Sequence, residues 1–363
     1  MAKKVTIRDI ACEAGVSVCC VSWVLGNHPR SKVVSEKTRQ RILDAAARLG
    51  YVQNQLAAAT RTGQVSTIAV IMNFNPNRKQ KDAFSNQVMQ GIMEETSVKK
   101  CSIKVFSADD LEKTFRLIVE NRISKVISTC VESAIREQTA ALAEKFSINL
   151  VFCFEHGHGH FPAVNTDNAE MTARAVHYFA ERGHSKIGML CVPHWAHYVE
   201  DRHAGYLRGM TECGLKTDPR WISCSDDTED ELEKMLSLPE EQRPTAFVAL
   251  ADNIAVTAQR YAWKRGLSIP QDFSVIGAGD TEAATLALVP VTTFREVLPE
   301  TGKLLVRLLL GEKPDFQPDE FNVYRTHAEM IERESVCNLA NRKIQVSRRK
   351  SQDNRKQKKG NRK

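Results

Sequence analysis

Long apolar runs are missing from this chain of 363 residues. No stretch reaches the roughly 20 apolar residues that a membrane-spanning helix needs, and the N-terminal MAKKVTIRDI lacks the apolar core of a signal peptide. We therefore expect a cytoplasmic protein with no membrane partner. The length exceeds what one ordinary hydrophobic core holds, so we expect two or more domains.

Regularly spaced cysteines are also missing. The ten cysteines are scattered, and no two of them form a CxxC pair. Zinc sites and disulfide frameworks need such spacing, so the sequence predicts reduced thiols that act as small apolar fillers. No Ser-His-Asp set or carboxylate pair is identifiable. We predict no catalytic residue, no metal and no cofactor, and we do not expect an enzyme.

Charge is distributed unevenly along the chain. Residues 1–63 hold ten Lys and Arg against four Asp and Glu, and residues 341–363 hold eleven against one. The whole chain carries +7, so residues 64–340 carry −9. Basic ends that flank an acidic body imply a polyanion partner for the ends. The tail, residues 341–363, is almost devoid of apolar residues, which predicts disorder; we hypothesise that it adds phosphate contacts on DNA.

The first 52 residues predict three short helices. Thr6 opens the first helix with the capping box TIRD, and Gly15 ends it because a sharp turn favours positive φ. Ser17 caps the second helix, and Ser35 opens a third at Glu36–Leu49. This pattern is typical of a helix-turn-helix module, whose second helix lies in the DNA major groove. A helical bundle for protein contacts is the alternative, and the basic excess counts against it.

These residues carry a family resemblance. TIRDIACEAGVSVCCVSWVLGN, followed by VSEKTRQRILDAAARLGY, resembles the DNA-binding head of the LacI/GalR family of bacterial transcriptional regulators. The match includes the turn, the caps and the core of the head. The resemblance implies a homodimeric, nucleoid-associated regulator, most often a repressor, bound to a palindromic double-stranded DNA operator.

The resemblance also implies which residues contact DNA. Val18 and Cys19 match the two variable base-reading positions, whereas Cys20 replaces a Thr and Trp23 replaces the Arg suited to guanine. A Trp lacks the two parallel donors of that Arg, so we hypothesise an altered operator preference; packing of Trp23 inside the head is the alternative. The implied DNA-contacting residues are Thr6, Ser17, Val18, Cys19, Cys20, Ser22, Trp23, Asn27, Thr60 and Arg61.

Residues 53–63 match the hinge helix of the family. That helix places a Leu wedge in the minor groove and bends the duplex. Here Thr60 stands at the wedge position and Ala58 replaces the usual Arg. Because Thr is shorter and partly polar, we predict a weaker kink.

Residues 64–340 alternate short apolar runs with amphipathic stretches. Such alternation predicts parallel sheets covered by helices on both faces. The expected strands are TIAVIMN (67–73), SIKVFS (102–107), KVIST (125–129), INLVFCF (148–154), KIGMLC (186–191), AFVAL (246–250) and SVIG (274–277). The expected helices are 84–99, 111–121, 135–145, 168–183, 200–213, 252–266 and 299–310.

The family resemblance continues through this body to about residue 336, in RHAGYLRGM, PTAFVALADN and PVTTF among others. It implies a two-lobed, periplasmic-binding-protein-like core with a small, carbohydrate-like effector between the lobes. The fold class is therefore α/β: a helix-turn-helix head (1–52), a hinge (53–63), the two-lobed body (64–340) and a disordered basic tail (341–363).

Five residues are the expected effector contacts. Arg202 matches the ligand-gripping Arg of the family, Phe84 an aromatic position after the first strand, and Asp252 an Asn-Asp pair. His197 and Tyr198 offer replacement contacts or are simply loop residues. Three further sequence features, at Gly279, Asp280 and HGHGH (156–160), need a separate interpretation.

The hydroxyl-holding Asp of the family is Gly279 here, which argues against a typical hexose. We interpret Asp280 as a helix cap. HGHGH (156–160) could bind a metal, but a glycine-rich surface loop is the favoured interpretation. Three other functions stay open. Gly279 and the basic tail favour an effector-independent architectural DNA-binding protein. The others are a carbohydrate-binding protein without a regulatory role and an α/β enzyme.

Overall fold

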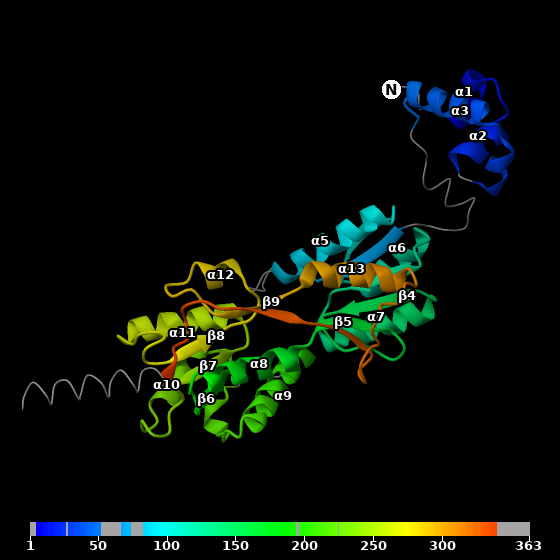
Figure 1. Ribbon diagram of the computed structural model, residues 1–363. Helices are drawn as coiled ribbons and strands as arrows, with labels where there is room; N and C mark the ends of the chain where they lie inside the picture. The colour runs from blue at the N-terminus through cyan, green and yellow to red at the C-terminus, as the bar shows by residue number, and fades with distance from the viewer. Residues whose placement is uncertain are drawn as a thin grey trace, which may run out of the picture. The chain divides into compact units, whose positions relative to one another are not determined.

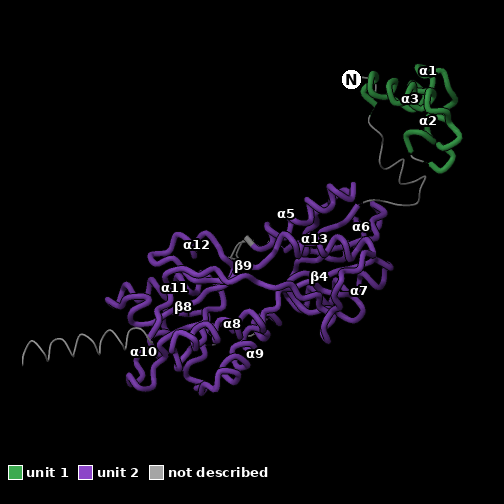
Figure 2. Tube along the Cα trace, viewed as in Figure 1, with its two compact units in different colours: residues 1–66 green, residues 67–363 purple. Residues whose placement is uncertain are grey.

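The computed structural model describes residues 5–26, 28–51, 67–73, 83–193, 196–223 and 225–339. The chain divides into two compact units, residues 1–66 and residues 67–363 (Figure 2). The predicted hinge (53–63) and tail (341–363) lie outside the described residues. No helix in the part of the chain that is described combines the length and apolar character required to cross a bilayer.

Unit 1 is the predicted three-helix head. It contains α1 (Ile7–Ala14), α2 (Val18–Leu25), the short 3-10 helix η1 (Pro29–Val33) and α3 (Glu36–Arg48). The capping box of Thr6 is present, and Gly15 has φ 61°, which ends α1 as expected. Ile10, Val21 and Ile42 are fully buried where the three helices meet. The helix-turn-helix prediction is confirmed.

The first lobe of unit 2, called the N-lobe, is built on a six-stranded sheet in the order β10-β5-β4-β3-β1-β2. Its pairings are all parallel. Helices α5 and α13 cover one face of the sheet and α6 and α7 the other (Figure 1). The strands are β1 (Thr67–Met72), β2 (Ser102–Ser107), β3 (Lys125–Ser128), β4 (Asn149–Cys153), β5 (Ala163–Thr166) and β10 (Val323–Thr326). The helices are α5 (Ala83–Val98), α6 (Leu111–Glu120), α7 (Ser133–Lys145) and α13 (Leu298–Leu309).

The second lobe, called the C-lobe, surrounds the parallel sheet β6-β7-β8, and β9 and β11 pair antiparallel beside it. The strands are β6 (Ile187–Leu190), β7 (Ala246–Ala249), β8 (Ser274–Ile276), β9 (Thr293–Glu296) and β11 (Ala328–Ile331). The helices are α8 (Asn168–Glu181), α9 (His197–Glu212), η2 (Pro219–Trp221), α10 (Thr228–Leu236), α11 (Asp252–Lys264) and α12 (Glu282–Thr285). α8 and α9 lie side by side (Figure 1), because Gly205 leaves room: a Cβ there would stand 2.1 Å from the backbone oxygen of Ala169.

The described chain crosses between the lobes after β5, after β9 and after β10, since each crossing leaves one sheet and joins the other lobe. The sequence predicted the seven central strands and the long helices to within a few residues at their ends. It missed β5, β9, β10 and β11, and the helices α10 and α12. The missed strands are short and border the crossings, where polar residues interrupt the apolar pattern.

A buried histidine couples the C-lobe to pH. His184 is 1% exposed, and its ring contacts Thr245 Oγ1 at 2.9 Å and the backbone oxygen of Cys337 at 3.1 Å. Burial lowers the pKa of His184 from 6.5 to about 4, while the Cys337 carbonyl opposes the shift. Between these two pH values His184 therefore binds a proton in the unfolded chain but stays neutral in the folded chain.

We expect this histidine to destabilise the fold in acid. Its contribution to stability is complete above pH 6.5 and is lost as the pH falls toward 4. Over that window the unfolding free energy should drop by about 2 kcal/mol more in the native sequence than in His184→Gln. Urea titrations at several pH values check this, with the half-exposed His177→Gln as the matched control. Equal pH slopes for the native protein and His184→Gln would contradict it.

Candidate DNA-reading helix and interlobe cleft

The N-terminal turn of α2 is exposed and capped. Ser17 Oγ accepts the backbone N–H of Cys20 at 3.2 Å, which satisfies one free amide of the helix start. Val18 is 43% exposed and Cys19 is exposed, whereas Cys20 is half-buried against the head core. The helix start thus offers two small, weakly polar side chains to the outside. Such side chains make apolar contact, as with a thymine methyl group, more readily than hydrogen bonds.

Trp23 is half-buried and supports a turn that carries a cation. Its ring stacks on His28 with centroids 6.4 Å apart, and the guanidinium carbon of Arg30 lies 5.8 Å from the Trp23 ring centroid. His28 also accepts the backbone N–H of Arg30 through Nδ1 at 3.1 Å. The ring of Trp23 therefore packs on the following turn of its own head, and the altered operator preference stays a prediction.

The other expected DNA contacts divide into two groups. Thr6 is exposed at the start of α1, and Ser22 is half-buried on α2. Asn27, Thr60 and Arg61 lie outside the described residues.

Arg202 lies at the crossings between the lobes rather than on an open surface. It is 6% exposed. Its Nε donates to Asn168 Oδ1 at 2.7 Å, its Nη2 donates to Glu296 Oε1 at 3.0 Å, and its Nη1 donates to the backbone oxygen of Leu250. Thr166 Oγ1 donates to the other oxygen of Glu296 at 2.6 Å. The guanidinium therefore joins two crossings to the end of β7.

Tyr198 and Asp252 also contact other residues of the chain. The ring of Tyr198 lies 5.4 Å from the guanidinium carbon of Arg202. Asp252 is 1% exposed and accepts the N–H of Thr281 at 2.7 Å and the hydroxyl of Thr293. Burial raises the pKa of Asp252, and these hydrogen bonds oppose the shift. Its carboxylate thus fixes the start of α12 to β9.

The segment after β8 corrects one prediction. Asp280 is not a helix cap, because Thr281 is the N-cap residue of α12. The carboxylate of Asp280 instead accepts from Arg295 Nε at 2.7 Å and from Arg333. Two guanidinium groups outcompete a helix start as partners for this carboxylate.

Phe84 packs closely against Gly279. Gly279 has φ 122°, and a Cβ at this glycine would lie 2.8 Å from Cζ of Phe84. The position therefore requires glycine both for its backbone and for its neighbour. An aromatic edge from the N-lobe thus lies against the backbone of the C-lobe at this position.

A stack of three rings also joins the lobes. His156 lies between His197 and Phe321, with centroid distances of 4.4 Å on both sides. His197 Nδ1 contacts Glu155 Oε2 at 2.8 Å, and His156 Nε2 contacts Asp201 Oδ1 at 3.2 Å. Although burial opposes it, His156 and Arg325 lower the pKa of Asp201.

The HGHGH segment thus behaves only in part as the surface loop that the sequence predicted. His158 and His160 are exposed, but His156 is packed in the ring stack. Within the described ranges no group of His, Cys, Asp and Glu is arranged to hold a metal.

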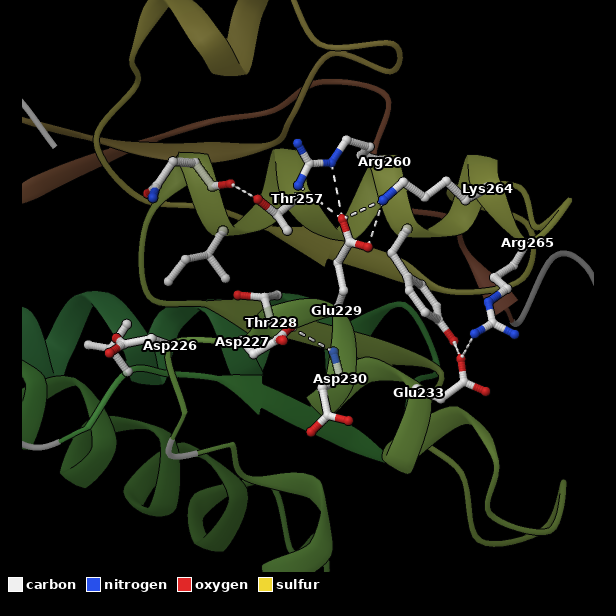
Figure 3. A pocket seen from close by; sticks show the side chains of 14 residues that line it. Asp226, Asp227, Thr228, Glu229, Asp230, Glu233, Thr257, Arg260, Lys264 and Arg265 are labelled. Atoms are coloured by element: carbon white, nitrogen blue, oxygen red, sulfur yellow. Dashed lines mark hydrogen bonds and ion pairs between the residues drawn. The ribbon is translucent and has the colours of Figure 1, made fainter. Parts of the chain in front are cut away.

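Two cavities open beside these contacts. One of 490 Å³ is lined by residues of α7, the 156–159 loop, His197 and the 320–322 loop. The other, of 890 Å³, lies between α10 and α11 and reaches Val192 and Asn253, which follow β6 and β7 (Figure 3). In Figure 3, Arg260 and Lys264 point to Glu229, with Lys264 Nζ 2.8 Å from Glu229 Oε2. Ligands of α/β proteins bind at such carboxyl ends of strands.

Comparisons with known proteins agree with this architecture. Residues 6–54 match the model of the bacterial regulatory proteins of the lacI family, and residues 176–336 match a periplasmic binding protein-like domain. The HTH-type transcriptional repressor PurR of Aliivibrio salmonicida is 28% identical over 92% of this chain and 99% of its own length. The HTH-type transcriptional repressor CytR of Escherichia coli K12 is 29% identical over 85% of this chain and 89% of its own length.

Solved structures give the same fold. A lac repressor dimer bound to operator and the anti-inducer ONPF superimposes with a TM-score of 0.72 at 21% identity, over 92% of this chain and all of that one. The regulator CelR in complex with cellobiose gives a TM-score of 0.62 at 20% identity, over the same shares. Head, lobes and relatives together define a helix-turn-helix transcriptional regulator with a periplasmic-binding-protein-like body. The chain thus combines a DNA-binding domain of the lacI family of bacterial regulatory proteins with a periplasmic-binding-protein-like domain, and its relatives include the repressors PurR and CytR.

Several site residues escaped sequence reasoning. Glu155 directly follows the predicted strand 148–154, and its place at a carboxyl end was an available signal. Arg30, Glu296 and Asn168 gave no comparable signal, because their partners are distant in sequence or depend on a side-chain rotamer.

We expect Trp23 and Arg30 to act as one unit on DNA. Trp23→Ala and Arg30→Ala should each weaken operator binding by about tenfold, and the double variant should be no weaker than either, because Trp23 holds Arg30. Fluorescence anisotropy on a selected operator measures this, with the exposed Arg41→Ala on α3 as control for the lost charge. Trp23→Arg should add a preference for guanine at one position. Additive losses, or the same guanine selected by native protein and Trp23→Arg, would count against the unit.

Breaking the Arg202–Glu296 pair should destabilise unit 2. Its side chains are 8% and 5% exposed, so Arg202→Met leaves a buried carboxylate without its cation. The unfolding free energy should fall by about 3–5 kcal/mol, and Arg202→Met/Glu296→Gln should recover part of the loss. Arg208→Met, which breaks the exposed pair with Glu170, should cost at most about 1 kcal/mol. Chemical denaturation compares the three variants; equal costs for Arg202→Met and Arg208→Met would refute a bridging role of Arg202.

Proposed function

We propose that this protein is a homodimeric transcriptional repressor, and that a small molecule held between its lobes sets its affinity for a palindromic operator. The observation that carries the proposal is the exposed, Ser17-capped start of α2, with Val18 and Cys19 facing outward. Two such helices related by a twofold axis suit half-sites spaced by about one helical turn of DNA. We expect it to act in the cytoplasm, at the nucleoid.

Exposed apolar side chains on the C-lobe support the homodimer. Leu286 and Leu288 are each 74% exposed, and Trp263 is 71% exposed. A second copy of the chain that covered them would remove apolar surface from water. The dimeric lac repressor among the structural neighbours supports the same arrangement.

The crossings support effector control. Two lobes linked by short strands can close on a ligand, and closure that moves the two heads couples effector binding to DNA binding. The cellobiose complex of CelR supports a carbohydrate-like effector for this chain. Phe84, His197, Tyr198, Arg202 and Asp252 remain our proposed surroundings of that effector, with Arg202 and Asp252 acting through the lobe contacts they make.

A second candidate is an architectural DNA-binding protein that senses no effector. The observation in its favour is that Arg202 and Asp252 are both bonded within the chain, and that Phe84 fills the place beside Gly279. The two candidates differ in one measurable respect, namely whether any small molecule alters operator affinity.

Selection of operator sequences by the full-length protein tests the proposal. Random duplexes should yield a palindrome, and sugars or nucleosides at millimolar concentration should change its affinity by roughly 5–150-fold. The Val18→Ala/Cys19→Ala variant should lose sequence preference but keep salt-sensitive, non-specific binding. Lack of preference among random duplexes at moderate ionic strength would overturn the proposal. A selected palindrome that no compound affects would favour the architectural candidate.

A further inference from the structure

The arginines around the crossings are already paired. Arg202 binds Glu296, Asn168 and the Leu250 carbonyl. Arg325 donates to Asp201 at 2.8 Å and to Asp319 at 2.7 Å. A ligand carboxylate or phosphate that entered between the lobes would have to displace one of these carboxylates from its guanidinium, and both displaced and entering charges would then repel.

Arg136 lines the smaller cavity. It donates to the backbone oxygens of Cys130 and His156 and is 4% exposed. Burial lowers its pKa to about 10, and the nearby charge of Glu155 opposes that shift. The guanidinium of Arg136 is therefore engaged by two backbone carbonyl groups.

Two acceptors, in contrast, are left over. Ser128 Oγ and Glu155 Oε1 are fully buried and have no hydrogen-bond partner in the described structure. Ser128 ends β3, and Glu155 follows the adjacent strand β4, so both lie at the carboxyl edge of the N-lobe sheet. The other oxygen of Glu155 contacts His197 of the C-lobe, which places this carboxylate between the lobes. A buried acceptor without a donor is energetically unfavourable, so a ligand that donates a hydrogen there is stabilised.

The larger cavity lies in the C-lobe, between α10 and α11, and is lined mainly by charged side chains. Five carboxylates line it, against three cations (Figure 3). The three cations are bound to two of those carboxylates: Arg260 and Lys264 to Glu229, and Arg265 to Glu233. Within this cavity of the C-lobe the carboxylates are thus in excess, and the cations are occupied.

We propose that the effector is a neutral or cationic molecule that donates hydroxyl or amine hydrogens to Glu155 and Ser128, and that the cleft excludes phosphorylated and carboxylate ligands. This inference rests on the proposed function. It separates free sugars, amino sugars and nucleosides, which fit, from their phosphate esters and acids, which do not. The Phe84 edge beside Gly279 gives the site an apolar side and removes one place where hydroxyls could be held.

Matched pairs of compounds test the exclusion on the full-length protein. The pairs are glucose and glucose 6-phosphate, ribose and ribose 5-phosphate, adenosine and adenosine monophosphate, with glucosamine as the cationic probe. Thermal shift and operator affinity are both measured. At least one neutral or cationic probe should act, and its phosphate ester should bind about 100-fold more weakly. An ester that binds more tightly than its parent would overturn the proposal.

Two variants locate the effect. Glu155→Gln should weaken binding of the active probe by about tenfold or more. Glu296→Gln should free Arg202, so that inorganic phosphate raises the melting temperature of this variant above its effect on the native protein. Glu170→Gln, which breaks only an exposed pair, should respond to phosphate as the native protein does, and phosphate on the basic head cancels in this comparison.

The outcomes separate two kinds of failure. If the operator is selected but no neutral or cationic probe changes stability or affinity, the inference about the ligand is wrong and DNA recognition stands. If no operator is selected, the proposed function itself has failed. Equal phosphate effects on Glu296→Gln and the native protein would show that Glu296 does not hold Arg202 away from anions.

Discussion

The buried ion pair between Arg202 and Glu296 constrains the whole of unit 2. Removing two charges from water costs several kcal/mol, and attraction repays this only where geometry and further hydrogen bonds are good. Here Arg202 has three acceptors, and Glu296 accepts from Thr166 as well. Two crossings and the end of β7 thus converge on one guanidinium, which holds these segments together. The residue that family resemblance marks as a ligand contact is, in this chain, bonded to three other segments of the chain.

In the head, too, neighbouring side chains hold an arginine in place. Its recognition helix carries neither a cation nor an amide in its first turn, so few hydrogen bonds to bases can come from α2 itself. The aromatic ring of Trp23 and the capping imidazole of His28 instead order a turn in which Arg30 is exposed. Because Arg30 lies in a neighbouring turn and not on α2, its charge can still attract DNA, but its side chain can reach other positions of the groove.

Sequence alone predicted the head almost completely, because caps, the turn glycine and apolar spacing act within a few residues of one another. Ser17 and Gly15 illustrate this, since both are where local chemistry requires them. The central strands were equally readable from apolar runs. The hydrogen bonds of Arg202 could not be predicted, because its partners Asn168, Leu250 and Glu296 come from three distant segments. The prediction that Asp280 caps a helix was wrong for the same reason. It considered only neighbouring residues, whereas the carboxylate binds Arg295 and Arg333, which are distant in sequence.

Ligand recognition and lobe coupling meet at one carboxylate. Glu155 holds His197, the first residue of α9, through one oxygen, while its other oxygen is unpartnered. Arg202 lies farther along the same helix, so a donor that engages Glu155 acts on the helix that also carries Arg202. A ligand shifts an equilibrium only by the difference in its affinity for the two states. That difference exists here because His197 belongs to one lobe and Glu155 to the other, so opening the lobes alters the very carboxylate that the ligand would bind. Burial raises the pKa of Glu155, and Arg136 and His197 oppose the shift, so a donating ligand further favours the charged form.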